Sequence, residues 1–154
     1  LSKKFPLGVA EKEKLKSFLA GAGYTVEDCG AYRLDPADDY PDFIKKAAEA
    51  VSKCEEGSPA KEAGQKCRGV IFGGSGQGEA MVANRFKNVR AAVYYGGEKR
   101  IIVLSREHND ANVLSLGARF LTAEQAIEAV KLWLDTPFNG DARHARRIGK
   151  IDPV

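Results

Sequence analysis

The chain lacks the features that mark secreted, membrane-spanning or metal-binding proteins. No apolar run approaches the roughly 20 residues that a membrane-spanning helix needs, and the first residues contain no apolar signal-peptide core. The 154 residues include only three cysteines and two histidines. Because Cys29, Cys54 and Cys67 are odd in number and widely spaced, they suit neither a disulfide framework nor a zinc site. We therefore expect a cytoplasmic protein with reduced thiols.

Neither sign of charge is in large excess. The formal net charge of +3 is too small to indicate a nucleic-acid or membrane partner. The hydrophobic fraction of 44% and the charged fraction of 29% are ordinary for a soluble protein that buries a core. The length predicts a single domain over residues 1–154, in which residues 138–154 form a basic C-terminal helix or tail.

Short apolar runs alternate with segments of helical periodicity. We expect strands at residues 5–10, 24–26, 70–72, 89–95 and 112–116. We expect helices at residues 11–20, 79–86, 101–106 and 123–134, and one that begins at Pro41. This alternation predicts a Rossmann-like three-layer α/β fold with a parallel sheet of about five strands. Such sheets bind ligands beyond the carboxyl ends of their strands.

A glycine-rich loop follows one predicted strand directly. Residues 73–79 read Gly-Gly-Ser-Gly-Gln-Gly-Glu, between an apolar run and a predicted helix. Glycines let the backbone approach an anion closely, and Ser75 and Glu79 add a hydroxyl and a carboxylate. No Lys-Ser/Thr pair follows, which excludes a nucleotide phosphate loop, and the acid lies too close for a dinucleotide fingerprint. A tight turn chosen for packing is the alternative.

Two further polar clusters stand out. Residues 106–112 contain His108 just before a predicted strand, and histidine is the side chain best suited to proton transfer near neutral pH. Arg143 and Arg147 lie four residues apart, so on a helix they share a face that suits a phosphate. The alternatives are a histidine without a role and a solvated basic helix end.

Together these clusters resemble the type B ribose-5-phosphate isomerases, a family that includes galactose-6-phosphate and allose-6-phosphate isomerases. The resemblance covers residues 11–151 and combines several motifs, which makes it more specific than any single one. The matching segments are residues 39–42, 69–79, 83–85, 89–92, 106–119, 136–138 and 143–147.

The resemblance implies an aldose–ketose isomerase that interconverts ribose-5-phosphate and ribulose-5-phosphate, or a related sugar phosphate, without a metal or organic cofactor. His108 matches the family's ring-opening histidine, and the neighbouring Asn109 holds the sugar. One branch of the family uses a cysteine base at the position of Gly73. The other branch uses a glutamate, and this chain is similar to that branch, with Glu79 as the base and serine at Ser75.

The same resemblance implies how the substrate is held. Backbone N–H groups of the loop and the Ser75 hydroxyl stabilise the enediolate oxygen, and arginines grip the phosphate. Family members form homodimers or homotetramers whose sites take residues from two subunits. The residues implied in substrate binding are Tyr40, Gly74, Gly76, Gly78, Asn109, Arg119, Arg143 and Arg147.

The chain departs from the family pattern near its N-terminus. The family carries an Asp-His pair after its first strand, whereas this sequence has no aspartate or histidine before residue 28. Because that aspartate assists ring opening, the alternative to an isomerase is a non-catalytic or impaired sugar-phosphate-binding relative. A subunit that completes its site with a homologous chain is a third hypothesis, and a pair that precedes Leu1 is a further alternative.

Overall fold

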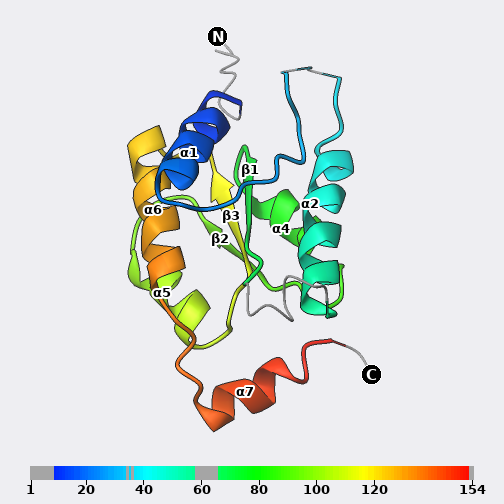
Figure 1. Cartoon of the computed structure of the whole chain (residues 1–154), viewed down its shortest axis with the longest axis vertical. Coiled ribbons are helices and arrows are strands. Elements are labelled where there is room, and N and C mark those ends of the chain that lie inside the picture. Colours follow the sequence, from blue (N-terminus) through cyan, green and yellow to red (C-terminus); the bar gives the residue numbers. More distant parts are fainter. Residues whose placement is uncertain (1–8, 34, 36, 58–65, 153–154) are drawn as a thin grey trace.

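The computed structural model describes residues 9–33, 35, 37–57 and 66–152, in which a parallel sheet lies between two layers of helices (Figure 1). The strands β1 (Gly69–Gly73), β2 (Ala91–Tyr94) and β3 (Val113–Gly117) lie in the order β1-β3-β2. Both neighbours pair with β3 in parallel register. The predicted α/β fold with a parallel sheet is therefore confirmed.

Helices cover both faces of the sheet. On one face lie α1 (Val9–Gly21), α5 (Arg100–Glu107) and α6 (Ala123–Asp135), and on the other lie α2 (Tyr40–Glu55) and α4 (Gln77–Ala83) (Figure 1). Side chains of β3 alternate between the two faces, so that Leu114 packs against the first layer and Val113 against the second. All five residues of β3 are buried, as expected for the central strand of a covered parallel sheet.

The helices α2, α5 and α6 carry apolar faces, and several helices begin with recognisable end signals. Pro41 occupies the first turn of α2, where its missing N–H costs nothing. Thr122 and Gln125 form a reciprocal capping box that begins α6. The basic C-terminal segment forms α7 (Ala142–Ile148), whose first N–H groups are capped by Asp141. Within the described ranges, no helix combines the length and the apolar character that a membrane crossing requires.

Two strand predictions near the N-terminus are wrong where the structure tests them. Val9 and Ala10 begin α1, while the rest of the predicted strand at residues 5–10 lies outside the described residues. Residues 24–26 pair with none of the described strands, and the chain turns off the end of α1 just before them, where Tyr24 N–H donates to the Leu19 carbonyl (3.0 Å). The described residues therefore contain three strands, not about five.

The cysteine prediction also needs correction. Cys54 in the last turn of α2 and Cys67 just before β1 form a disulfide, with their Cα atoms 6.2 Å apart. The fold returns the chain beside the end of α2, and this approach is invisible in the spacing of the cysteines along the sequence. Only Cys29 among the described cysteines remains a free thiol, and burial raises its pKa.

Candidate active site

The glycine loop lies at the carboxyl edge of the sheet, between β1 and α4, and is fastened to β3. Gly76 adopts φ +75°, and a Cβ there would lie 3.1–3.2 Å from backbone atoms of Leu116, Gly117 and Ser115. The buried Ser115 hydroxyl donates to the Gly76 carbonyl at 2.5 Å. Only glycine combines this left-handed conformation with so close an approach, so the loop has one conformation that depends on residue 76.

The residues after β3 hold the start of the same loop. Ala118 N–H donates to the Gly73 carbonyl (2.8 Å), and Arg119 N–H donates to the Gly74 carbonyl (3.1 Å). The Arg119 guanidinium lies over Gly74, since a Cβ there would be 2.9 Å from its Cζ. Arg119 and Gly74, both predicted as site residues, are thus brought together at the carboxyl edge.

The Glu79 carboxylate lies directly over Gly73. A Cβ on Gly73 would meet the Glu79 carboxyl atoms at 1.8–2.3 Å, which means that the carboxylate fills the space of a side chain at residue 73. Glu79 is 7% exposed although it is ionisable. Within the part of the chain that the structure describes, no hydrogen bond or ion pair reaches this carboxylate. A buried carboxylate with free lone pairs is available to accept a proton.

Tyr40 and Ser75 complete the carboxyl-edge group. A Cβ on Gly78 would lie 2.5 Å from the Tyr40 hydroxyl oxygen, so this phenol from the start of α2 rests on the first turn of α4. The half-buried Ser75 hydroxyl accepts a long hydrogen bond from Gln77 N–H (3.4 Å). The predicted residues on this edge are Tyr40, Gly74, Ser75, Gly76, Gly78, Glu79 and Arg119.

His108 and Asn109 lie at the other edge of the sheet, after α5 and before β3. The His108 ring stacks on His144 of α7, with the ring centroids 4.2 Å apart and the planes inclined by 17°. Burial of the His144 side chain, and then the neighbouring His108, lower the pKa of His144 below its ordinary 6.5. Asn109 is exposed beside His108. His144 was not predicted as a site residue, although it lies between Arg143 and Arg147, which were.

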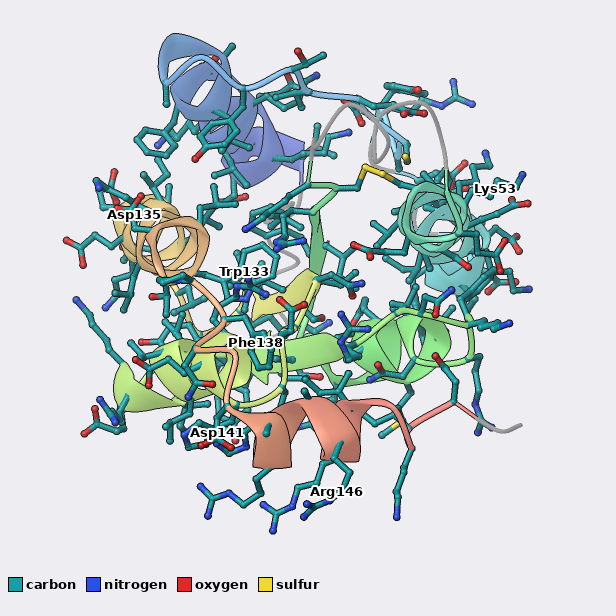
Figure 2. All side chains as sticks on the ribbon, turned by 60° about the horizontal axis from the view of Figure 1, so that its bottom comes forward. Lys53, Trp133, Asp135, Phe138, Asp141 and Arg146 are labelled. Carbon is teal, nitrogen blue, oxygen red and sulfur yellow. A yellow bond between two sulfur atoms is a disulfide. The ribbon has the colours of Figure 1, made fainter. Side chains whose placement is uncertain are left out.

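The helix α7 stands apart from the two layers, beneath the amino ends of the strands (Figures 1 and 2). Its single buried residue is His144, while Arg143 and Arg147 are exposed. The Arg143 side chain is 59% exposed, with its Nε 4.0 Å from the Asp141 carboxylate. Both predicted phosphate-binding arginines are therefore accessible and lie on the same edge as His108.

The structure does not bring all the predicted site residues together within one chain. Glu79 touches Gly73, which pairs with Gly117 at the carboxyl end of β3, whereas His108 precedes Val113 at its amino end. The four residue steps from Val113 to Gly117 span about 13 Å. One group of predicted residues thus lies at each edge of the sheet.

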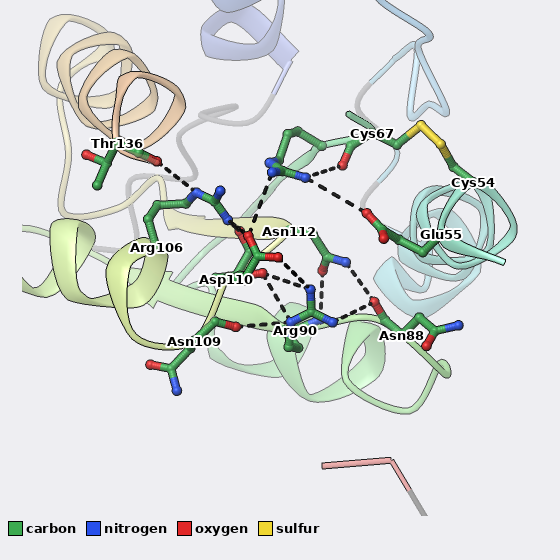
Figure 3. A network of polar contacts seen from close by, with 12 residues as sticks. Cys54, Glu55, Cys67, Asn88, Arg90, Arg106, Asn109, Asp110, Asn112 and Thr136 are labelled. Carbon is green, nitrogen blue, oxygen red and sulfur yellow. Dashed lines mark hydrogen bonds and ion pairs between the residues drawn. A yellow bond between two sulfur atoms is a disulfide. The ribbon is translucent and has the colours of Figure 1, made fainter. Parts of the chain in front are cut away.

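A polar network explains why part of the 106–112 cluster is structural (Figure 3). Asp110, at φ +44°, accepts from Arg106 Nη1 at 2.7 Å and lies 3.5 Å from Arg90 Nη2. The Asn112 amide bridges the Arg90 N–H and the Asn88 carbonyl. These contacts shape the turn that presents His108 and Asn109. In this run Arg106 and Asn112 bond to backbone groups, and Asp110 accepts from arginine side chains, so these three side chains have structural contacts.

The described ranges contain no gathering of three or more His, Cys, Asp or Glu side chains that would suit a metal ion. The polar groups at the two edges are a carboxylate, a hydroxyl, amides, an imidazole stack and guanidinium groups. Such groups can move protons and hold a phosphorylated ligand.

Comparisons with known proteins agree with this arrangement. A family model described as Ribose/Galactose Isomerase matches residues 6–151. Ribose-5-phosphate isomerase B of Mycobacterium tuberculosis is 34% identical over 141 residues, which cover 92% of this chain and 80% of that protein. The structure of ribose-5-phosphate isomerase B from Mycoplasma genitalium with bound ribulose-5-phosphate superposes with a TM-score of 0.81 at 35% identity, covering 93% of this chain and 86% of that one.

A second solved structure, the ribose 5-phosphate isomerase of Thermotoga maritima, gives a TM-score of 0.78 at 37% identity and covers 96% of this chain and 92% of that one. The matches extend over nearly the whole chain, far beyond the glycine loop. The resemblance drawn from the sequence motifs is therefore confirmed, and the chain belongs to the ribose/galactose isomerase family.

Proposed function

We propose that this chain interconverts ribose-5-phosphate and ribulose-5-phosphate through an enediolate, with Glu79 as the base. The observation that carries the proposal is the Glu79 carboxylate, which is buried, unpaired among the described residues and seated over Gly73 in the glycine loop. The relatives reported above are named as isomerases of this reaction, which supports an aldose–ketose isomerase over a non-catalytic binder.

Ring opening is the first step. It moves the proton of the C1 hydroxyl to the ring oxygen, breaks the bond between C1 and that oxygen, and leaves an open-chain aldehyde. His108 is the proton carrier that we assign to this step, because an imidazole both donates and accepts near neutral pH. Asn109, exposed beside it, offers amide hydrogen bonds to the sugar hydroxyls.

Proton transfer between carbons follows. Glu79 removes the proton from C2, and the electron pair forms the C1–C2 double bond while the carbonyl oxygen becomes an oxyanion. Loop N–H groups from Gly74 to Gly78 and the Ser75 hydroxyl belong to the loop on which the carboxylate rests at Gly73, and they suit that oxyanion. The proton returns from Glu79 to C1, the O2 proton moves to O1, and the ketose results.

The phosphate lies far from the reacting carbons and anchors them. Arg143 and Arg147, one turn apart on α7 and both exposed, suit two charge-assisted forks to its oxygens. Arg119, whose guanidinium rests over Gly74, is a third candidate on the loop side. Binding energy from the phosphate then positions the carbons for Glu79.

A complete site on this account needs two chains, because Glu79 and His108 lie at opposite edges of one sheet. We infer a homodimer, or a homotetramer made of two such dimers, in which the amino edge of one protomer faces the carboxyl edge of its partner. Tyr95 and Phe120 support this, since they are 50% and 61% exposed, pack together at 5.9 Å and lie beside the loop at Gly117. We also propose that the enzyme is located in the cytoplasm.

The direct test is Glu79→Gln. We expect kcat for ribulose-5-phosphate formation to fall about 100- to 10,000-fold while ribose-5-phosphate still binds, because the amide keeps the shape and loses the base. Glu49→Gln, on the exposed side of α2, is the matched control and keeps full activity. Unchanged turnover in Glu79→Gln would exclude the assignment, and binding without any turnover in the wild type would establish the non-catalytic alternative.

A further inference from the structure

A hollow of about 250 Å³ opens at the amino edge, on the side away from α7, and takes no part in the proposed isomerase reaction. It lies between the end of α6 and the residues that lead into β1. Half of its polar lining residues are basic, and none of the lining residues was predicted from the sequence as a site residue. Those polar lining residues are Tyr24, Lys66, Arg68, Arg106, Asp135 and Thr136.

Arg106 is the innermost cation of this hollow and is only 3% exposed. Its Nε donates to the Thr136 carbonyl (3.2 Å), and its Nη1 donates to Asp110 (2.7 Å) and the Ala111 carbonyl (2.6 Å). Its Nη2 donates to no described atom and is not among the fully buried atoms that lack a partner, so it keeps some exposure. Because Arg106 lines the hollow, the Nη2 donors are available there.

Arg68 and Lys66 add donors that the described residues do not fully satisfy. The Arg68 Nη1 donates to the Cys67 carbonyl (2.9 Å), whereas its Nη2 lies 3.8 Å from Asp110, beyond hydrogen-bond distance. Lys66 forms no ion pair with any residue that the structure describes. Burial, and then the nearby Arg106, lower the pKa of Arg68, as expected where positive charges outnumber their partners.

The carboxylates around the hollow are already engaged. One Asp110 oxygen serves both Arg106 and Arg68, and its other oxygen lies 3.5 Å from Arg90. Asp135 lines the hollow but forms an ion pair with Lys131. Glu55 lies 3.9 Å from the Arg68 Nη1. Among the lining residues themselves, Lys66, Arg68 and Arg106 face the single carboxylate of Asp135, so the lining holds more positive than negative charge.

A second hollow of about 210 Å³ adjoins the first and has a different character. The two share Tyr24, Leu134 and Asp135, and the second adds Phe18, Ala22 and Lys131. Lys131 is paired with Asp135, so the apolar surface of the second hollow is that of Phe18, Ala22 and Leu134 beside the Tyr24 ring. A basic compartment beside this mixed one suits a molecule with an anionic head and an apolar or aromatic body.

We propose that this paired hollow binds a phosphomonoester of an aromatic or apolar group, with Lys66, Arg68 and the Arg106 Nη2 on the phosphate and Tyr24 beside the organic part. Arg106 is fixed by three hydrogen bonds, so the phosphate end is organised before binding. The ligand is separate from the sugar phosphate at Glu79, because no residue is common to the two sites.

Calorimetric titration with phenyl phosphate tests the proposal in an Arg143→Gln/Arg147→Gln background, where the proposed substrate phosphate site has lost its two arginines on α7. We expect one phenyl phosphate per chain, with inorganic phosphate binding about tenfold more weakly because it leaves the apolar compartment empty. Adding Lys66→Gln and Arg68→Gln should weaken binding at least about tenfold. Lys53→Gln with Arg100→Gln removes the same charge at exposed positions and should leave binding unchanged.

Asp135→Asn should instead strengthen the binding of phenyl phosphate. It removes the lining carboxylate and frees Lys131, so phenyl phosphate should bind about fivefold more tightly. If the Arg68→Gln variant does not fold, Asp135→Asn and Lys66→Gln alone still test the proposal. No binding in the background protein, or binding that neither Lys66→Gln nor Asp135→Asn alters, would overturn the proposal.

The isomerase assay separates this proposal from the proposed function. Lys66→Gln should retain wild-type conversion of ribose-5-phosphate while it loses phenyl phosphate affinity. Calorimetry reads the paired hollow whether or not the chain is an isomerase, so failure of one proposal leaves the other measurable. Loss of turnover in Lys66→Gln together with loss of binding would show one site, not two, and would overturn the separation.

Discussion

The two edges of the sheet differ in how they hold their polar groups. At the carboxyl edge, backbone contacts to β3 fix the glycine loop, and Glu79 is buried against it without a polar partner in the described chain. At the amino edge, His108 stacks on a helix that buries one residue of its own, and the arginines of that helix are exposed. Contacts within a single chain therefore position the polar groups of the carboxyl edge, whereas the arginines of the amino edge are open to solvent.

This difference suggests a division of work between chains. A rigid, partly dehydrated edge suits the base and the oxyanion donors, because their positions must not change during the reaction. An exposed helix end suits the capture of a charged substrate from solvent. Four predictions test whether the edges act in this way, and whether they act across two protomers.

The largest effect is expected from mixing two inactive variants. Glu79→Gln disables the carboxyl edge and His108→Asn disables the amino edge. If each site joins the two edges of different protomers, a mixed dimer keeps one intact site, and random exchange restores about a quarter of wild-type activity. Turnover is measured after co-refolding equal amounts of both chains. Activity that stays at the level of the separate variants would place both groups in one chain.

Arg147→Gln tests substrate capture at the amino edge. The loss of one charge-assisted fork should raise KM for ribose-5-phosphate about 10- to 100-fold with a smaller change in kcat. Steady-state kinetics measure both constants, and Arg146→Gln on the same helix is the control. Equal losses in the two variants would show that only the general charge of α7 matters.

Gly76→Ala compared with Gly140→Ala tests the rigidity of the two edges. Both glycines have positive φ, +75° and +70°, but only Gly76 has backbone atoms within 3.2 Å of the added Cβ, while Gly140 has none within 4 Å. We expect Gly76→Ala to lower the free energy of unfolding by about 2 kcal/mol and Gly140→Ala by about 1 kcal/mol. Chemical denaturation measures both, and equal values would contradict the close packing at Gly76.

The smallest effect concerns protonation of His144. Because its folded-state pKa is lowered, the unfolded chain binds the proton more readily than the folded one. The contribution of His144 to stability is therefore complete above pH 6.5 and declines as the pH falls below that value. NMR titration should give a pKa below 6.5, and His108→Asn should raise it in part, since burial persists. A pKa that the variant leaves unchanged would contradict the influence of His108.

Much of the fold follows from local patterns in the sequence. Apolar stripes and end signals such as Pro41 and Thr122 locate the helices, and short β-branched runs locate β1, β2 and β3. The run at residues 24–26 is similarly rich in β-branched and aromatic residues, but it has no strand partner among the described residues. Strand formation depends on a partner that lies far away in the sequence.

The site is predictable in type but not in full geometry. The position of the glycine loop after one strand and of His108 before another already implies opposite edges of a parallel sheet. The seat of the Glu79 carboxylate on Gly73, the His108–His144 stack, the Cys54–Cys67 bond and the open donors of Arg106 are contacts between distant segments. No spacing along the chain contains that information.

The contact between Glu79 and Gly73 also links what these two positions can carry. A side chain at residue 73 and the carboxylate of residue 79 occupy the same volume, since the added Cβ would lie 1.8 Å from the Glu79 Cδ. A cysteine at residue 73 would therefore require the Glu79 carboxylate to turn away or residue 79 to change. On the proposed function, that movement takes the base out of its seat in the loop, so a change of residue 73 and a change of residue 79 are expected to occur together.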